Sequence, residues 1–311
     1  MSTRPARLRD GARIGIVSPA YWPLPDRLAR AVGLFEGLGY EVVLGKNVGL
    51  RQDKYAGPPE ARAEDLVAMF ADPSIDAIIC ARGGYGINRV LPLLDYELIA
   101  ANPKILVGFS DITGLLTTIS QRCGFVTFHG PMLTTFGKET IQYNVETLLK
   151  VLSGEDNVEI HSLDACQARC LSPGVTSGPL WGGNLSLLIE RLGTPGQICA
   201  DGAILFIEDI DEKLHAFDRM LLQLRTSGCL DGIRGLVVGE MLEMHDGGDV
   251  SFGKNTDEIV MDVFGDLDIP IISHFPCGHG DCQATLPVSH TVQLHADPDD
   301  PRIRIPRSPV S

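Results

Sequence analysis

Short apolar runs alternate with amphipathic segments through the first half of the chain. The apolar runs end in Gly, Ser or Pro turns, which is typical of strands, and they lie at 12–20, 41–48, 75–84, 104–111 and 125–132. The segments between them repeat apolar positions at helical spacing and lie at 25–40, 59–71, 88–95 and 111–123. Strands that alternate with helices predict an α/β fold with a parallel sheet covered on both faces.

The pattern changes after about residue 153. Residues 153–178 are polar and turn-rich, which indicates a connection or a region of short strands. A second αβ pattern follows, and the tail at 296–311, rich in Pro and Asp, predicts a surface strand or an extended end. The elements of this second pattern are helices at 182–193 and 215–228 and strands at 202–211 and 233–241.

Length and charge narrow the class of protein. A chain of 311 residues with 44% hydrophobic positions suits two globular domains, each with its own core. We expect a nucleophile-bearing domain over 1–155, a connecting segment over 156–172 and a C-terminal domain over 173–311. The net charge of −14 argues against a nucleic-acid partner, because phosphate binding depends on clustered Lys and Arg.

Targeting signals and cysteines point to the cytoplasm. The apolar segment near the N-terminus covers only 14–17, too short for a signal peptide, and no run approaches the length of a membrane span. The eight cysteines are scattered, so we expect reduced thiols. An alternative is a zinc site that uses Cys166, Cys170, Cys277 and Cys282 around His279, although zinc motifs usually show closer paired spacings.

Ser110 follows a predicted strand and precedes a predicted helix. Ile105 to Val107 form the apolar run, and Ile112, Leu115 and Leu116 recur at helical spacing. The carboxyl ends of parallel strands are where open sheets bind ligands, so this corner suits a nucleophile. The alternative is that Ser110 or Asp111 only caps the helix.

A serine nucleophile needs a base and a carboxylate that orients the base. Glu208 lies at the end of an apolar strand, and His279 lies between two glycines that let the loop turn closely around it. His129 is a rival base, because it ends a strand of the first domain near Ser110. A solvated acidic loop is the alternative interpretation of the Glu208 segment.

The turn RGGYG at 82–86 offers backbone N–H groups for an oxyanion, as does the N–H of Asp111. Phosphate binding is a weaker interpretation, because the glycine spacing is not that of dinucleotide sites and no Lys-Ser or Lys-Thr pair follows. The serine motif also lacks the second glycine of G-x-S-x-G, since Ile112 stands there. An α/β-hydrolase fold is therefore not expected.

The motifs taken together resemble the LD-carboxypeptidase family of serine peptidases, from about residue 12 to about residue 295. The matching stretches are ARGGYG at 81–86, GFSD at 108–111, HGPM at 129–132, LWGGNLSLL at 180–188, FIEDIDE at 206–212, RMLLQL at 219–224, and GH with TLP at 278–287. The resemblance implies a flavodoxin-like or amidotransferase-like N-terminal domain and a mixed α/β C-terminal domain.

The resemblance also implies a catalytic triad of Ser110, His279 and Glu208, with an oxyanion hole at the N–H groups of Gly84 and Asp111. The implied reaction releases the terminal D-alanine of a murein tetrapeptide in the cytoplasm, with no cofactor, usually in a homodimer. The candidates for substrate binding are Arg82, Tyr85, Trp181 and Asn184.

Two alternatives accompany this interpretation. The same superfamily includes microcin-immunity hydrolases of aminoacyl-sulfamoyl adenylates, and Trp181 could stack on the base of such a substrate. The LWGGNL stretch that contains Trp181 also fits the recycling enzymes, so this residue does not separate the two functions. A non-catalytic, amidotransferase-like ligand-binding module would keep the sheet without needing Ser110, Glu208 and His279 together.

Overall fold

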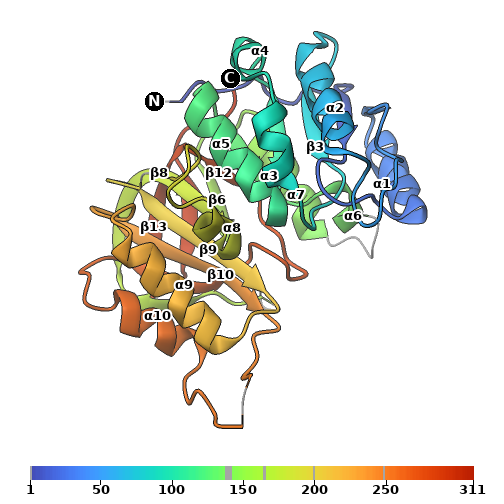
Figure 1. Ribbon diagram of the computed structural model, residues 1–311. Coiled ribbons are helices and arrows are strands. Elements are labelled where there is room, and N and C mark those ends of the chain that lie inside the picture. The colour runs from blue at the N-terminus through green and yellow to red at the C-terminus, as the bar shows by residue number, and fades with distance from the viewer. Residues whose placement is uncertain (1, 137–141, 164–165, 199, 248) are drawn as a thin grey trace. The chain divides into compact units, whose positions relative to one another are not determined.

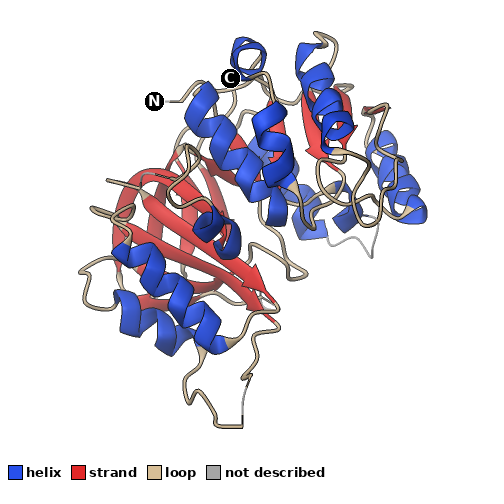
Figure 2. Ribbon diagram, in the orientation of Figure 1, coloured by secondary structure: helices blue, strands red, loops and turns tan. Residues whose placement is uncertain are grey.

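A computed structural model of the protein describes residues 2–136, 142–163, 166–198, 200–247 and 249–311 (Figure 1). The chain forms two compact units. The first unit contains residues 1–155 together with two later segments, 284–289 and 308–311, and the second contains 156–283 and 290–307. Each unit has a sheet with helices beside it, as the colouring of Figure 2 makes clear.

The first unit contains a sheet of six strands among the described residues, in the order β12-β5-β4-β3-β1-β2. The five strands from the N-terminal half are parallel, and β12 is antiparallel to β5. Their bounds are β1 Arg13–Val17, β2 Glu41–Leu44, β3 Ala77–Cys80, β4 Ile105–Gly108, β5 Thr127–His129 and β12 Leu286–Val288. The predicted parallel sheet and α/β class are confirmed.

Helices connect these strands because their apolar positions fall on one face. In α2, for example, Leu66, Met69 and Phe70 are buried at helical spacing. The helical segments are α1 Pro25–Gly37, α2 Pro59–Ala71, α3 Ile87–Val90, η1 Leu91–Leu93, α4 Tyr96–Ala101, η2 Ser110–Ile112, α5 Thr113–Cys123, α6 Leu133–Phe136 and α7 Gln142–Leu152.

The second unit contains a mixed sheet of eight strands among the described residues, in the order β6-β14-β13-β8-β9-β10-β11-β7. Strands β8 to β11 are parallel, and the outer strands on both sides are antiparallel. The strands are β6 Val158–His161, β7 Arg169–Ser172, β8 Gly174–Asn184, β9 Ile204–Ile210, β10 Gly235–Leu242, β11 Ile271–Phe275, β13 Thr291–Ala296 and β14 Arg302–Ile305.

One apolar core joins this sheet to its helices. Leu205 and Ile207 of β9 and Leu236 of β10 pack with buried residues of α9, including Phe217 and Leu221. Figure 1 shows α9 and α10 side by side against these strands. The helices are α8 Leu185–Glu190, α9 Leu214–Thr226 and α10 Thr256–Phe264. Among the described residues, no helix is both long and apolar enough to cross a membrane.

The cysteines depart from the expectation of free thiols. Cys166 and Cys282 form a disulfide with their Cα atoms 6.5 Å apart, although 116 residues separate them in the chain. The prediction of reduced thiols is therefore wrong for this pair. Cys80, Cys123, Cys170, Cys229 and Cys277 form no disulfide among the described residues, and Cys199 lies outside them.

Candidate active site

Ser110 occupies a strained corner at the end of β4. The strand Ile105–Gly108 is fully buried, and Ser110 follows it with φ 61, in the left-handed region that non-glycine residues seldom adopt. Such strain concentrates at functional sites. Gly83 lies beside this corner, since a Cβ atom on it would fall 3.0 Å from Cβ and 3.2 Å from Oγ of Ser110.

Helix capping does not account for this corner. The N-cap residue of α5 is Ile112, and it makes no side-chain capping bond. The carboxylate of Asp111 accepts a hydrogen bond from the N–H of Ile87, at 3.0 Å, which is the first residue of α3. Asp111 therefore ties the nucleophile corner to the start of α3, directly after the glycine turn.

The glycine turn 82–86 is held from several sides. Gly84 has φ 125, and a Cβ atom there would overlap the ring of Tyr21. The buried Arg62 donates from Nη1 to the carbonyl oxygens of Pro19, at 2.8 Å, and Gly86, at 3.2 Å. Within the described residues the N–H of Gly84 donates no hydrogen bond, so this group is available to an oxyanion.

Glu208 and His279 lie together in the second unit. Nδ1 of His279 is 2.7 Å from Oε2 of Glu208, and the Glu208 side chain is fully buried. The His279 side chain is 16% exposed, so its ring reaches the surface while the carboxylate does not. A carboxylate at Nδ1 fixes the tautomer and leaves Nε2 to exchange a proton, which is the arrangement of a general base.

The close pairing depends on glycine at position 278. Gly278 has φ 113, and a Cβ atom there would lie 2.7 Å from Oε2 and 2.8 Å from Cβ of Glu208. The backbone of the His279 loop therefore passes directly over the carboxylate, which only glycine permits.

We expect Gly278→Ala to lower turnover about 100-fold, because the added methyl group displaces Glu208 from His279, and misplacement of about 1 Å can cost that much. Gly253→Ala is the matched control. Gly253 also has positive φ, at 77, but a Cβ atom there meets nothing within 4 Å. Steady-state kinetics of both purified variants check this, and equal losses would show that backbone strain alone matters.

Glu240 on β10 is a site residue that sequence analysis missed. Its backbone N–H donates to the carbonyl of Cys277 at 3.1 Å, and its carboxylate accepts a hydrogen bond from the backbone N–H of Gly280. Burial raises the pKa of Glu240, and the nearby Asp281 adds to the effect. Glu240 thus holds both sides of the His279 loop, and no sequence signal distinguished it from other acidic residues.

We expect Glu240→Gln to stabilise the protein at neutral pH. The amide can still accept the Gly280 N–H but carries no charge. Because the pKa of Glu240 is raised in the folded chain, the unfolded chain loses that proton first, so ionisation costs stability as pH rises above the ordinary value of 4.5. Thermal midpoints measured from pH 4 to 8 should separate as pH rises, and a gap that widens toward low pH would contradict this.

Asn184 is occupied by hydrogen bonds within its own unit. Its Nδ2 donates to Oδ1 of Asp209 at 2.9 Å, and its Oδ1 accepts from the N–H of Leu187, which caps α8. Asp209 is buried beside Glu208, and its pKa is raised by burial and by that neighbouring charge. Asn184 therefore satisfies a buried carboxylate next to the Glu208–His279 pair.

The other predicted substrate-binding residues are divided between the two units. Trp181 is on β8 and packs partly against the core of the second unit. Tyr85 is 48% exposed on the glycine turn, and the Arg82 guanidinium lies 5.7 Å from the centre of the Tyr21 ring. Only Arg82 and Tyr85 therefore share a unit with Ser110.

His129, the rival base, is buried on β5. It is 1% exposed, pairs with Gly108 in the sheet register, and its ring contacts Phe109 with centroids 6.0 Å apart. A ring packed in this way is less able to exchange a proton with substrate or water than the partly exposed His279.

A cavity of about 610 Å³ opens beyond the end of β10 in the second unit. Met241, Glu243, Lys254 and Asn255 are among its lining residues. None of the predicted site residues lines this cavity, so its size alone does not make it the reaction centre.

The cysteine alternative loses two of its ligands. The disulfide occupies Cys166 and Cys282, and burial raises the pKa of the Cys277 thiol, which disfavours the thiolate that zinc requires. In the described part of the chain, no three His, Cys, Asp or Glu side chains form a group that could hold a metal ion.

The sequence of this chain matches the models of two domains of one protein family. Residues 14–130 match the model of the LD-carboxypeptidase N-terminal domain, and residues 177–294 match that of the LD-carboxypeptidase C-terminal domain. The probable murein peptide carboxypeptidase of Bacillus subtilis is 36% identical over 291 residues, which covers 93% of this chain and 90% of the relative.

Solved structures extend the likeness. The muramoyltetrapeptide carboxypeptidase from Oxalobacter formigenes aligns with a TM-score of 0.85 at 30% identity, over 96% of this chain and 100% of that one. The microcin C7 self-immunity protein MccF of Escherichia coli is 28% identical over 331 residues, covering 96% of this chain and 94% of MccF. A structure of MccF in complex with aspartyl sulfamoyl adenosine aligns with a TM-score of 0.89 at 26% identity, over 99% of this chain and 100% of that one.

Proposed function

Since this chain belongs to the LD-carboxypeptidase family, we propose that it hydrolyses the L,D peptide bond that holds the terminal D-alanine of a murein tetrapeptide. Family membership makes it a peptidase, which favours catalysis over a non-catalytic ligand-binding module. The observation that carries the proposal is the 2.7 Å hydrogen bond between His279 and the buried Glu208.

The proposed mechanism assigns Ser110 as the nucleophile. Its Oγ attacks the scissile carbonyl carbon while Nε2 of His279 takes the hydroxyl proton. The carbonyl oxygen becomes an oxyanion that accepts hydrogen bonds from the N–H groups of Gly84 and Asp111. Collapse breaks the C–N bond, and His279 returns the proton to the nitrogen of the leaving D-alanine.

The second half of the reaction regenerates the enzyme. The shortened peptide remains as an ester on Ser110, and His279 removes a proton from water, which attacks the ester carbonyl. The ester C–O bond breaks, Ser110 recovers its proton, and the tripeptide leaves as a free acid. The Glu208 carboxylate stabilises the imidazolium that forms twice in the cycle.

Likeness to MccF favours a second candidate function, the hydrolysis of an aminoacyl-sulfamoyl adenylate. Incubation of the enzyme with murein tetrapeptide and, separately, with aspartyl sulfamoyl adenosine tests both, with products read by mass. We expect tripeptide and free D-alanine from the first and slower or no release of aspartate from the second. Cleavage of the adenosine compound alone would contradict the murein proposal.

The location and assembly are also proposals. The family resemblance supports a cytoplasmic location and a homodimeric assembly. The disulfide between Cys166 and Cys282 is more typical of an oxidising compartment and does not support a cytoplasmic location. Thiol labelling in intact cells and sedimentation of the purified protein address these two points.

A further inference from the structure

Three cations gather beside the glycine turn of the first unit, and we call Arg51, Lys54 and Arg82 the cationic patch. Each lies over an aromatic ring. The Arg51 guanidinium is 4.1 Å from the Trp22 ring centre, the Lys54 ammonium is 5.9 Å from that of Tyr21, and Arg82 is 5.7 Å from the same ring. Sequence analysis singled out only Arg82.

The patch carries charge that no carboxylate neutralises. In the described part of the chain, none of its three cations lies within 4.0 Å of a carboxylate, although Asp53 is next to Lys54 in sequence. An aromatic ring attracts a cation but leaves its charge in place.

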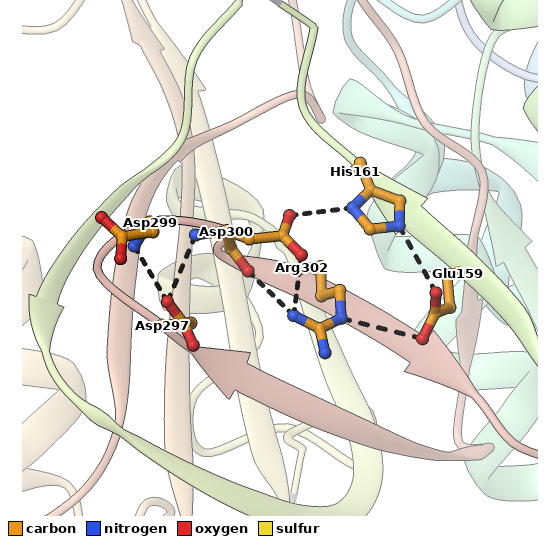
Figure 3. A network of polar contacts seen from close by, with 6 residues as sticks. All are labelled: Glu159, His161, Asp297, Asp299, Asp300 and Arg302. Carbon is orange, nitrogen blue, oxygen red and sulfur yellow. Dashed lines mark hydrogen bonds and ion pairs between the residues drawn. The ribbon is translucent and has the colours of Figure 1, made fainter.

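Arg302 in the second unit shows the opposite arrangement, in which carboxylates lie beside the cation. Its side chain contacts Asp300 at 2.9 Å and Glu159 at 3.7 Å, and both carboxylates also contact His161 (Figure 3). There the positive charge of Arg302 is balanced by Asp300 and Glu159. The cationic patch instead keeps a positive charge that an external anion can bind.

The patch also has a fixed position next to the reaction centre of this unit. Tyr21 donates its backbone N–H to the carbonyl of Gly83 at 3.3 Å, and its ring covers Gly84. Gly83 in turn lies against Ser110. Tyr21 therefore contacts both the proposed oxyanion turn and two cations of the patch.

The loop that carries Arg51 and Lys54 is tied to the same segment. Ala56 donates its N–H to the carbonyl of Ala20 at 3.0 Å, and the Trp22 indole donates to the carbonyl of Asp53 at 3.1 Å. Rings of Tyr21 and Tyr55 also pack edge to face, 6.1 Å apart. These contacts hold the cations in place before any ligand arrives, which lowers the entropy cost of binding.

We propose that Arg51 and Lys54, with Arg82, form a subsite that binds carboxylates of the peptide substrate. This inference rests on the proposed function and names a specificity determinant that motif analysis does not reveal. A murein tetrapeptide offers two sources of this chemistry: the terminal carboxylate of D-alanine, and the free α-carboxylate of its γ-linked glutamate.

Binding measurements in a Ser110→Ala background test the subsite, because chemistry is then blocked. Titration calorimetry compares that protein with versions that also carry Lys54→Gln, Arg51→Gln or both. We expect each change to weaken tetrapeptide binding about three- to fivefold, as for exposed ion pairs, and the pair to weaken it about tenfold. Lys46→Gln is the control, since Lys46 pairs with Glu64 and the change in net charge is the same.

Two amidated peptides identify the carboxylate. One peptide is amidated at the terminal carboxylate and the other at the glutamate α-carboxylate. If the patch binds one of these carboxylates, the Arg51 and Lys54 changes should no longer weaken binding of the peptide in which that carboxylate is amidated. Equal losses on all peptides, or losses matched by Lys46→Gln, would overturn the subsite. Turnover by the wild-type enzyme is measured separately: absence of tetrapeptide cleavage contradicts the proposed function, whereas cleavage with unchanged binding in the variants contradicts the subsite alone.

Discussion

Ser110→Ala is expected to lower tetrapeptide turnover by roughly three to six orders of magnitude, the range seen when a serine nucleophile is removed. The hydroxyl supplies the attacking oxygen, and the methyl group of alanine cannot replace it. Stability should change little, because the N-cap residues of η2 and α5 are Phe109 and Ile112, so Ser110 is the N-cap of neither segment. Turnover and thermal midpoint measured on the same preparation check both parts.

Ser289→Ala provides the matched control for this change. Ser289 is also a serine of the first unit with positive φ, at 66, although it is buried whereas Ser110 is half-buried, so the two substitutions share a left-handed backbone setting. We expect Ser289→Ala to keep nearly full turnover. If both variants lose activity in proportion to lost folded protein, Ser110 has a structural role and the nucleophile is elsewhere.

His279→Ala is expected to cut turnover by about four to six orders of magnitude, and Glu208→Gln by about four. The imidazole carries every proton of the proposed cycle, and the Gln side chain no longer stabilises the imidazolium. His129→Ala should leave most of the activity per folded molecule, although removal of a buried ring lowers stability by about 2–4 kcal/mol. Turnover normalised to the folded fraction separates these roles.

A larger normalised loss from His129→Ala than from His279→Ala would place the base in the first unit. The Glu208–His279 hydrogen bond would then be a structural ion pair of the second unit. Retention of activity in Glu208→Gln with loss in His279→Ala would instead show that the base needs no carboxylate to orient it.

The first sheet was predictable because each of its parallel strands precedes its own helix along the chain. The apolar run before Ser110 and the periodicity of 59–71 appear as β4 and α2. Strand β12 was not predicted, since it pairs with β5 from more than 150 residues away and its three residues carry no periodic signal. Strand β8 was not predicted because its glycines interrupt the apolar pattern. These glycines allow β9 to approach closely, since a Cβ atom on Gly182 would overlap the backbone of Phe206.

The candidate site was predictable where chemistry depends on residue type next to a turn. Glu208 and His279 were chosen because one ends a strand and the other lies between glycines, and the structure brings them within hydrogen-bond distance. Glu240, Arg62 and the Cys166–Cys282 pair were not predicted. Their roles depend on contacts with residues far away in the sequence, and the spacing of residues along the chain does not predict such contacts.

The proposed mechanism requires Ser110 and His279 to act together in catalysis, although they belong to different units. The most direct test is the residual kcat/KM of the Ser110→Ala/His279→Ala double variant on murein tetrapeptide, compared with each single variant. Members of a triad act together, so the kcat/KM of the double variant should lie within about twofold of that of the less active single variant. Penalties that multiply in the double variant would show that the two residues act independently and would contradict the triad.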